Sequence, residues 1–229
     1  MRKKMQIVPR IMRLPLVLTL VCNSIAYNGT RLFMSDKVHY NLSNALDDRI
    51  PFVPWTVTIY LGCYVFWVVN YVIGCRQDRE EAFRFLSADL LTKLVCFLCF
   101  LFLPTTNTRP VIEGSGIWDE CMKLLYQLDA ADNLFPSIHC LTSWFCFIAV
   151  RKNEKIPKWY RFASLFMALS VCVSTLTTKQ HVLIDVAAGV AIAEISYLFV
   201  EKCGFSRWYM NFILKAEGRM GGKKLQTEK

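Results

Sequence analysis

The sequence predicts an all-α protein, a polytopic membrane bundle of six transmembrane helices. Three observations support this prediction. Hydrophobic residues make up 54% of the 229 residues, with a mean hydropathy of +0.32, whereas apolar residues make up about 45–50% of a typical soluble domain. The apolar residues gather in long uncharged runs, as bilayer-spanning helices require. The basic residues gather in alternate connecting segments, which is typical of membrane proteins.

Six apolar runs are candidate spans, at 11–27, 53–74, 85–103, 137–150, 159–178 and 182–200. A bilayer core needs roughly 20 apolar residues in helical form, and four of the runs meet this length. The first run is marginal because it contains Asn23. It follows several basic residues, as a signal peptide does, but no small-x-small cleavage site comes after it, so we expect a retained helix.

The fourth run is short, and its length places its outer end. The segment 137–150 has 14 residues, or about 21 Å of helix at 1.5 Å per residue. We therefore expect its outer end to lie below the membrane surface, at the depth of the lipid headgroups.

The remaining segments belong to the same single domain, which covers 1–229. Two outer loops, 28–52 and 104–136, are the main parts outside the membrane, and 117–128 within the second is expected to form a short helix at the interface. The segment 201–229 is predicted to be a basic cytoplasmic tail with a frayed end.

The positive charges predict the orientation of the chain. With the N-terminus inside, 20 of the 27 Lys and Arg residues lie in inner segments and six lie in outer loops. This asymmetry predicts an integral protein of the plasma or cell membrane with both termini cytoplasmic. The net charge of +9 is then expected to face anionic lipid, so a nucleic-acid partner is not predicted.

The ten cysteines and Lys93, the one lysine within a predicted span, are expected to have structural roles. Most of the ten cysteines fall in apolar runs, where a thiol behaves as a small hydrophobe. Cys96 and Cys99 have metal-binding spacing, but no histidine lies nearby, so no metal site is predicted. Lys93, in the inner half of the third run, is expected to snorkel toward the cytoplasmic headgroups and receives no catalytic role.

Chemistry-bearing residues concentrate in three outer places, and the first is the turn that contains Arg109. The segment 104–110 follows the third run and ends in Arg109-Pro110. Arginine presents a planar fork of donors that suits phosphate oxygens, and Pro110 keeps Arg109 out of helical geometry. A solvated interfacial arginine is the alternative interpretation of this turn.

The second place is the start of the fourth run, Phe135-Pro136-Ser137-Ile138-His139. Proline and serine before an apolar run predict a helix start with Ser137 as the N-cap. Free backbone N–H groups at a helix start attract anions, and His139 stands in the first turn above them. The alternative is a capping serine with an interfacial histidine.

The third place is the start of the sixth run, where Lys179, His181 and Asp185 follow one another. His181 and Asp185 are four residues apart, so they share one face of a helix. An aspartate in an apolar membrane run is costly and needs a partner, which the imidazole N–H of His181 supplies. This pair is typical of an activated nucleophile or general base, and Lys179 adds a positive charge. A structural His–Asp pair is the alternative.

The sequence resembles the type 2 phosphatidic acid phosphatase superfamily in three motifs. They occur in the order Arg109-Pro110, Pro136-Ser137-x-His139 and Ser174-x6-His181-x3-Asp185. That family is a six-helix membrane bundle with the motifs Lys-x6-Arg-Pro, Pro-Ser-Gly-His and Ser-Arg-x5-His-x3-Asp. The resemblance covers about 90–200.

The resemblance implies a metal-independent enzyme with no cofactor and a lipid phosphate or phospholipid substrate, acting on the extracytoplasmic face. It implies His181 as a nucleophile that forms a phosphohistidine, Asp185 as its orienting group and His139 as the acid. Arg109 and Ser137 are implied as phosphate ligands.

Three positions depart from the family motifs. The first-motif lysine falls at Phe102, the second-motif glycine at Ile138 and the third-motif arginine at Thr175. Lys179 is a candidate replacement for the missing phosphate cation. A Pro-Ser-aliphatic-His motif is also similar to the inositol phosphorylceramide synthase-like branch, and fewer cations suit a phosphodiester substrate.

The predicted function is therefore an integral-membrane phosphoesterase of the phosphatidic acid phosphatase type, which cleaves a lipid phosphate ester. The alternatives are a lipid headgroup phosphotransferase and a non-catalytic membrane protein of the same fold. The retained Asp185 counts against the non-catalytic alternative, because a scaffold has little use for an intramembrane carboxylate.

Overall fold

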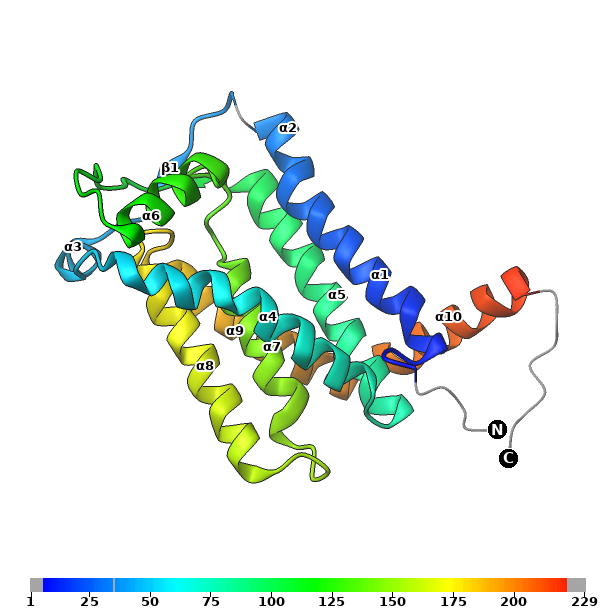
Figure 1. Ribbon diagram of the computed structural model, residues 1–229. Coiled ribbons are helices and arrows are strands. Elements are labelled where there is room, and N and C mark those ends of the chain that lie inside the picture. The colour runs from blue at the N-terminus through cyan, green and yellow to red at the C-terminus, as the bar shows by residue number, and fades with distance from the viewer. Residues whose placement is uncertain (1–5, 35, 222–229) are drawn as a thin grey trace.

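The computed structural model describes residues 6–34 and 36–221 and is an all-α bundle (Figure 1). Its elements, in chain order, are α1 (Arg10–Ser24), the π-helical η1 (Ile25–Gly29), α2 (Thr30–Met34), β1 (Tyr40–Asn41), α3 (Ala45–Arg49), the 3-10 turn η2 (Pro54–Thr56), α4 (Val57–Cys75), α5 (Arg79–Phe102), β2 (Thr105–Thr106), α6 (Ile117–Leu128), α7 (Ile138–Arg151), α8 (Lys158–Thr177), α9 (Leu183–Cys203) and α10 (Phe205–Gly221).

Helices occur at all six predicted spans. Within the described residues, five continuous helices are long and apolar enough to cross a membrane, and they are Arg10–Met34, Pro54–Cys75, Arg79–Phe102, Lys158–Thr177 and Leu183–Cys203. The sixth, α7, is apolar and has 14 residues, which matches the short run that the sequence predicts.

Two helices extend beyond the predicted spans. The first span continues through η1 to Met34 instead of ending at residue 27. The third begins at Arg79 instead of residue 85, because Glu80 and Glu81 occupy its first turn, where the helix dipole favours acidic side chains. Hydropathy alone misses such a polar first turn.

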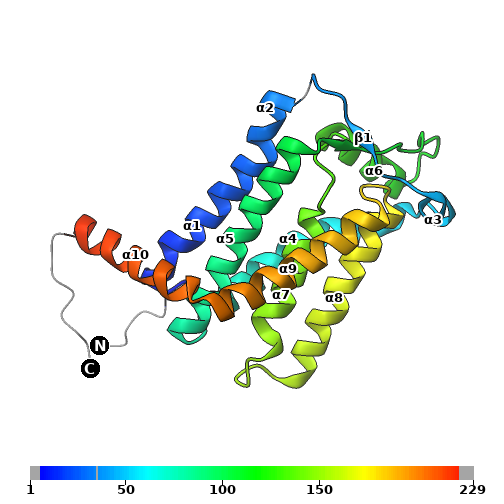
Figure 2. The ribbon, with the colours of Figure 1, turned by 180° about the vertical axis from the view of Figure 1, so that it is seen from behind.

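Helix α7 lies inside the bundle and packs against α4, α8 and α9 (Figure 2). The contact with α9 is close at Gly189, where an added Cβ would lie 2.6 Å from the Ser137 carbonyl oxygen. Only a residue without a side chain permits this approach. The glycine therefore brings the start of α7, which carries His139, against the start of α9.

The expectation that Lys93 snorkels toward the cytoplasmic headgroups was wrong, because its side chain is buried in the bundle. Its side chain is 3% exposed, and its Nζ lies 3.0 Å from Asp89 Oδ1, one turn earlier in α5. Thr142 Oγ1 of α7 accepts from Nζ at 3.2 Å, and Tyr71 of α4 donates to Asp89 at 2.8 Å. A buried counter-charge removes the need to reach water, because paired charges are tolerated inside a membrane bundle.

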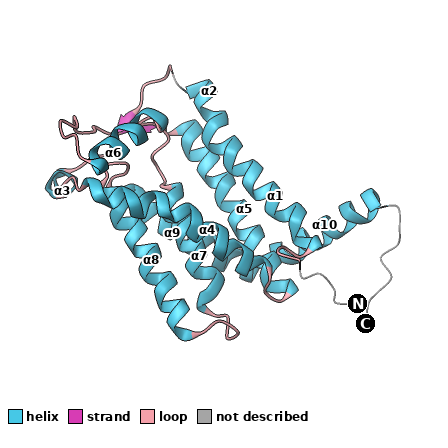
Figure 3. Cartoon of the chain, in the orientation of Figure 1, coloured by secondary structure: helices cyan, strands magenta, loops and turns pink. Residues whose placement is uncertain are grey.

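One end of the bundle carries a cap, made of α3, α6 and the short parallel pair β1–β2 (Figures 1 and 3). Helix α6 spans the predicted 117–128, and its Met122 and Leu125 pack against Val57 and Tyr60 of α4. The cap closes over the turn between α8 and α9. We call this the capped end, and the end with the α7–α8 loop and α10 the distal end.

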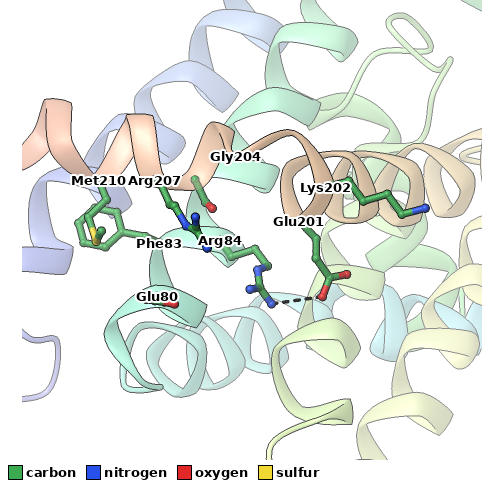
Figure 4. Close-up of a pocket in the computed structure, with 9 residues that line it drawn as sticks. Glu80, Phe83, Arg84, Glu201, Lys202, Gly204, Arg207 and Met210 are labelled. Atoms are coloured by element: carbon green, nitrogen blue, oxygen red, sulfur yellow. Dashed lines mark hydrogen bonds and ion pairs between the residues drawn. The ribbon is translucent and has the colours of Figure 1, made fainter.

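The segment after Val200 is predicted to be a basic tail with a frayed end, and its described part is helical. Helix α9 stops at Gly204, which has a left-handed φ of 73°, and α10 then runs across the distal end. Tyr209 and Ile213 of α10 are buried in the main core. At the corner, a pocket of 140 Å³ contains the Arg84–Glu201 ion pair of 3.4 Å (Figure 4). Residues 222–229 of the predicted tail lie outside the described residues.

Candidate active site

His181 and Asp185 form a contact at the turn before α9. The backbone N–H of His181 donates to the Thr175 carbonyl at 3.1 Å, which holds the turn against the end of α8. His181 Nδ1 lies 3.4 Å from Asp185 Oδ2, and the same oxygen accepts the Val182 backbone N–H at 3.0 Å. Asp185 therefore both caps α9 and orients His181. Because Nδ1 faces the carboxylate, the electron pair that could attack a substrate is on Nε2.

The surroundings of His181 change its pKa in opposite directions. Burial of the ring lowers the pKa, whereas the hydrogen bond and the negative charge of Asp185 raise it, and the net result is a pKa above the usual 6.5. The raising effects together outweigh burial, and the hydrogen bond and charge of Asp185 are the largest of them because the carboxylate lies beside the ring. A proton on His181 is thus held more firmly than on an exposed histidine.

His139 approaches His181 from the first turn of α7. The two ring centroids are 6.0 Å apart. His139 stacks on Tyr60, with 4.4 Å between centroids, and its Nδ1 lies 3.4 Å from the Tyr60 hydroxyl. That hydroxyl donates to Asp129 at 3.4 Å, so its oxygen is free to accept a hydrogen bond from His139 Nδ1–H. His139 Nε2 is buried and has no partner among the described side chains.

Ser137 is the predicted N-cap of α7. Its side-chain oxygen accepts the Cys140 backbone N–H at 3.3 Å, and its own N–H donates to the Asp185 carbonyl at 3.1 Å. Both bonds are inside the protein, since Ser137 is fully buried. The sequence prediction of the cap is confirmed, and the cap is attached directly to the residue that orients His181.

Arg109 joins the loop 104–136 to the turn that contains His181. Its guanidinium donates to the Asp129 carbonyl at 2.5 Å and to the side-chain oxygen of Gln180, and it lies 4.7 Å from the Tyr126 ring centroid. Burial raises the pKa of Tyr126 to about 12, against the opposing effect of Arg109, so its hydroxyl stays protonated and donates to the Thr178 carbonyl at 2.8 Å.

Gln180 and Asp129 belong to this site although sequence reasoning missed them. Gln180 is 1% exposed. Its oxygen must face Arg109, because arginine has only donors, and its side-chain nitrogen has no partner within the described part of the chain. Asp129 accepts from Tyr27, Arg31 and Tyr60. The available signal was the position of Gln180 directly before His181.

Lys179 lies beside this group in the chain, but its ammonium binds elsewhere. Its Nζ donates to the carbonyls of Asp47 at 3.0 Å and Ile50 at 2.6 Å, so two of its three N–H groups hold the end of α3. Phe102 and Thr175 occupy the two positions where the family motifs have cations, and they differ in exposure. Phe102 is 76% exposed, and the buried Thr175 hydroxyl donates within its own helix, to Cys172.

The structure thus brings His139, Ser137, His181, Asp185 and Arg109 together at the capped end, from three separate parts of the chain. A family model described as the PAP2 superfamily matches residues 37–199, which contain all of them. The chain belongs to the PAP2 superfamily. This membership supports a phosphatase-type phosphoesterase in the membrane.

No curated protein and no solved structure matches this PAP2-superfamily chain significantly. The family assignment therefore comes from the family model alone.

Proposed function

We propose that this chain cleaves a lipid phosphate ester through a phosphohistidine intermediate on His181. The observation that supports it best is the approach of His139 and His181, with ring centroids 6.0 Å apart, together with the bond from Arg109 to Gln180, the residue before His181. Two imidazoles and an arginine supply the groups that phosphoryl transfer needs, a nucleophile, an acid and a charge stabiliser.

In the proposed first step, His181 Nε2 attacks phosphorus and the bond from phosphorus to the lipid alkoxide breaks. His139 donates a proton to the leaving alkoxide oxygen, and Asp185 accepts the Nδ1–H of the cationic His181 ring. In the second step a water gives its proton to His139 and attacks phosphorus. The N–P bond then breaks, His181 is restored and phosphate leaves.

Phosphate binding is assigned to Arg109 and to the start of α7 at Ser137. Arg109 is held by backbone carbonyls and by Gln180, so its position is set before substrate binds, and preorganised donors stabilise transition-state charge most effectively. The first-turn N–H groups of α7 add a positive potential. The bonds of Lys179 to Asp47 and Ile50 favour a loop-anchoring role for this residue.

We further propose that the capped end is extracytoplasmic and that both termini are cytoplasmic, in a plasma or cell membrane. The excess of basic residues in the segments at the distal end supports this orientation. The proposed chemistry uses protein cations and needs no metal.

Headgroup transfer between lipids is the second candidate. It is favoured because Phe102 and Thr175 occupy the positions where the family motifs have a lysine and an arginine. The site therefore lacks these two cations. A site with fewer cations suits a phosphodiester, which carries one charge less than a phosphomonoester. A lipid hydroxyl would then replace water in the second step.

The test is phosphate release from phosphatidic acid by the full chain in detergent micelles with excess chelator. We expect release by the wild type and a loss of at least about 1,000-fold in His181→Ala. His39→Ala is the matched control, because His39 contacts only a nearby backbone carbonyl in the described structure.

Full activity of folded His181→Ala would contradict the phosphohistidine. If the folded wild type releases no phosphate, a labelled phospholipid and a hydroxyl-bearing lipid acceptor test the second candidate. Absence of both activities would leave the non-catalytic alternative.

A further inference from the structure

A second set of cations surrounds a pocket at the distal end of the bundle, far from the site above. The pocket has a volume of 500 Å³ and lies between the end of α7 and the start of α8. Its lining consists of three basic residues and three apolar ones, Phe147, Arg151, Lys158, Arg161, Phe162 and Leu165. No carboxylate lines it among the described residues, so its potential is positive.

The pocket and the candidate active site are at opposite ends of one helix. Helix α8 begins with Lys158 at the pocket and ends with Thr177, four residues before His181. Its 20 residues span about 30 Å at 1.5 Å per residue, the thickness of a bilayer core. A molecule in this pocket therefore belongs to the other membrane leaflet and is not the substrate at His181.

The placement of Lys158 and Arg161 is unfavourable for the helix alone. Both lie in the first turn of α8, which contains no acidic residue, and the positive end of the helix dipole disfavours cations there. In the described structure neither forms an ion pair, and Arg161 contacts only the Arg151 carbonyl, at 3.5 Å. A bound anion would remove this repulsion.

Arg151 contributes an anchored third cation. Two of its nitrogens bind Glu194 of α9, one of them at 3.0 Å. Its Nε is buried without a partner among the residues that the structure describes. Glu194 neutralises much of the charge of Arg151, so most of the net positive charge at the pocket is on Lys158 and Arg161.

An apolar stripe continues from the pocket along α8. Phe162, Phe166 and Leu169 are exposed at helical spacing on a helix that is long and apolar enough to cross a membrane. Exposed aromatic and aliphatic side chains on such a helix face acyl chains. A headgroup held by the cations would thus place its acyl chain on this stripe.

We propose that this pocket binds an anionic phospholipid of the leaflet opposite the candidate active site. The headgroup phosphate lies between Lys158 and Arg161, with Arg151 beside it, and an acyl chain follows Phe162 and Phe166. The combination of a cationic pocket and an apolar stripe on one helix is what such a lipid requires.

The test uses Trp159, which lies between the two cations in the chain and is 69% exposed. The full chain in micelles is titrated with phosphatidylserine brominated near the headgroup, and separately with the equally brominated phosphatidylcholine. Quenching that disappears in Trp159→Phe reports lipid at this pocket. We expect the phosphatidylserine to saturate this quenching at a lower mole fraction than the phosphatidylcholine.

The decisive comparison is between two double variants that remove the same charge. Lys158→Gln/Arg161→Gln changes the pocket, whereas Lys152→Gln/Lys155→Gln changes the same α7–α8 loop outside it, at side chains that are 67% and 72% exposed. We expect the half-saturating mole fraction to rise at least about fivefold in the first and about twofold or less in the second, since each nearby basic residue contributes about a factor of five.

Three results would overturn the proposal. They are equal quenching by the two lipids in the wild type, equal shifts in the two double variants, and full displacement of the lipid by soluble glycerophosphoserine. If the first double variant does not fold, Lys158→Gln alone, at an exposed position, is compared with Lys155→Gln in the same way.

Discussion

The backbone N–H of Ser137 donates to the backbone carbonyl of Asp185 at 3.1 Å. This one bond ties the start of α7, with His139 in its first turn, to the first turn of α9, whose carboxylate orients His181. Gly189 lies at the same crossing and lets the two helices approach. The separation of the two histidine rings therefore depends on a close helix contact and on Gly189, which has no side chain that could take part in the chemistry.

Gly189→Ala tests this dependence. Its Cβ would lie 2.6 Å from the Ser137 carbonyl oxygen, and overpacking of this kind costs about 1–3 kcal/mol. We expect a lower melting temperature and a lower kcat. Gly62→Ala is the matched control, because the nearest atom to its Cβ is a flexible methionine methyl at 4.0 Å. Unchanged activity and stability of Gly189→Ala would show that the crossing is adaptable.

The raised pKa of His181 predicts the pH dependence of turnover. A protonated ring cannot attack through Nε2, so the acidic limb of kcat/KM should lie above about pH 6.5, the ordinary value for histidine. Asp185→Asn removes the charge that raises this pKa. Its acidic limb should move to lower pH while the rate falls by about 100-fold or more. An unmoved limb would mean that another group titrates.

The same shift predicts a pH dependence of stability. A histidine whose pKa is higher in the folded state stabilises the fold fully below about pH 6.5, and this contribution is lost as the pH rises through the folded-state pKa. The melting temperature of the wild type should therefore decrease across this range more than that of Asp185→Asn. Parallel curves would indicate that the His181–Asp185 contact does not contribute to stability.

Lys179→Met separates loop anchoring from phosphate binding. The change removes two bonds from the ammonium to the carbonyls of Asp47 and Ile50, which should cost about 1–3 kcal/mol. Folded molecules should keep kcat/KM within about tenfold, whereas Arg109→Lys, which loses the planar fork of donors, should lose more. A loss of kcat/KM in Lys179→Met without loss of stability would make Lys179 a phosphate ligand.

Lys93→Met tests the buried ion pair. It leaves Asp89 charged and unpaired inside the bundle, which should destabilise the fold by about 3–5 kcal/mol. The double change Asp89→Asn/Lys93→Met should recover most of this loss, because the side-chain amide introduced in place of the carboxylate would still accept the Tyr71 hydroxyl without carrying a charge. Chemical unfolding of both variants measures the difference. A harmless single change would mean that water reaches the pair.

Local patterns were sufficient for several features of this protein. The positions of the six apolar helices, the short α7, the helix α6 and the N-cap at Ser137 depend on neighbours in the sequence, so hydropathy and capping residues predict them. The pairing of His181 with Asp185 is also local, because four residues make one helical turn. The polar first turn of α5 and the helix α10 were missed, since neither stands out in hydropathy.

Other features were decided only by the tertiary structure. The Lys93–Asp89 pair meets Thr142 and Tyr71 only because α4, α5 and α7 pack together. Gln180 reaches Arg109 only because the loop 104–136 folds over the α8–α9 turn. The sequence determined by itself where the six apolar helices and α6 lie and which residues can carry charge or protons. Packing decided which of them meet, because contacts between distant segments depend on the shape of the whole bundle.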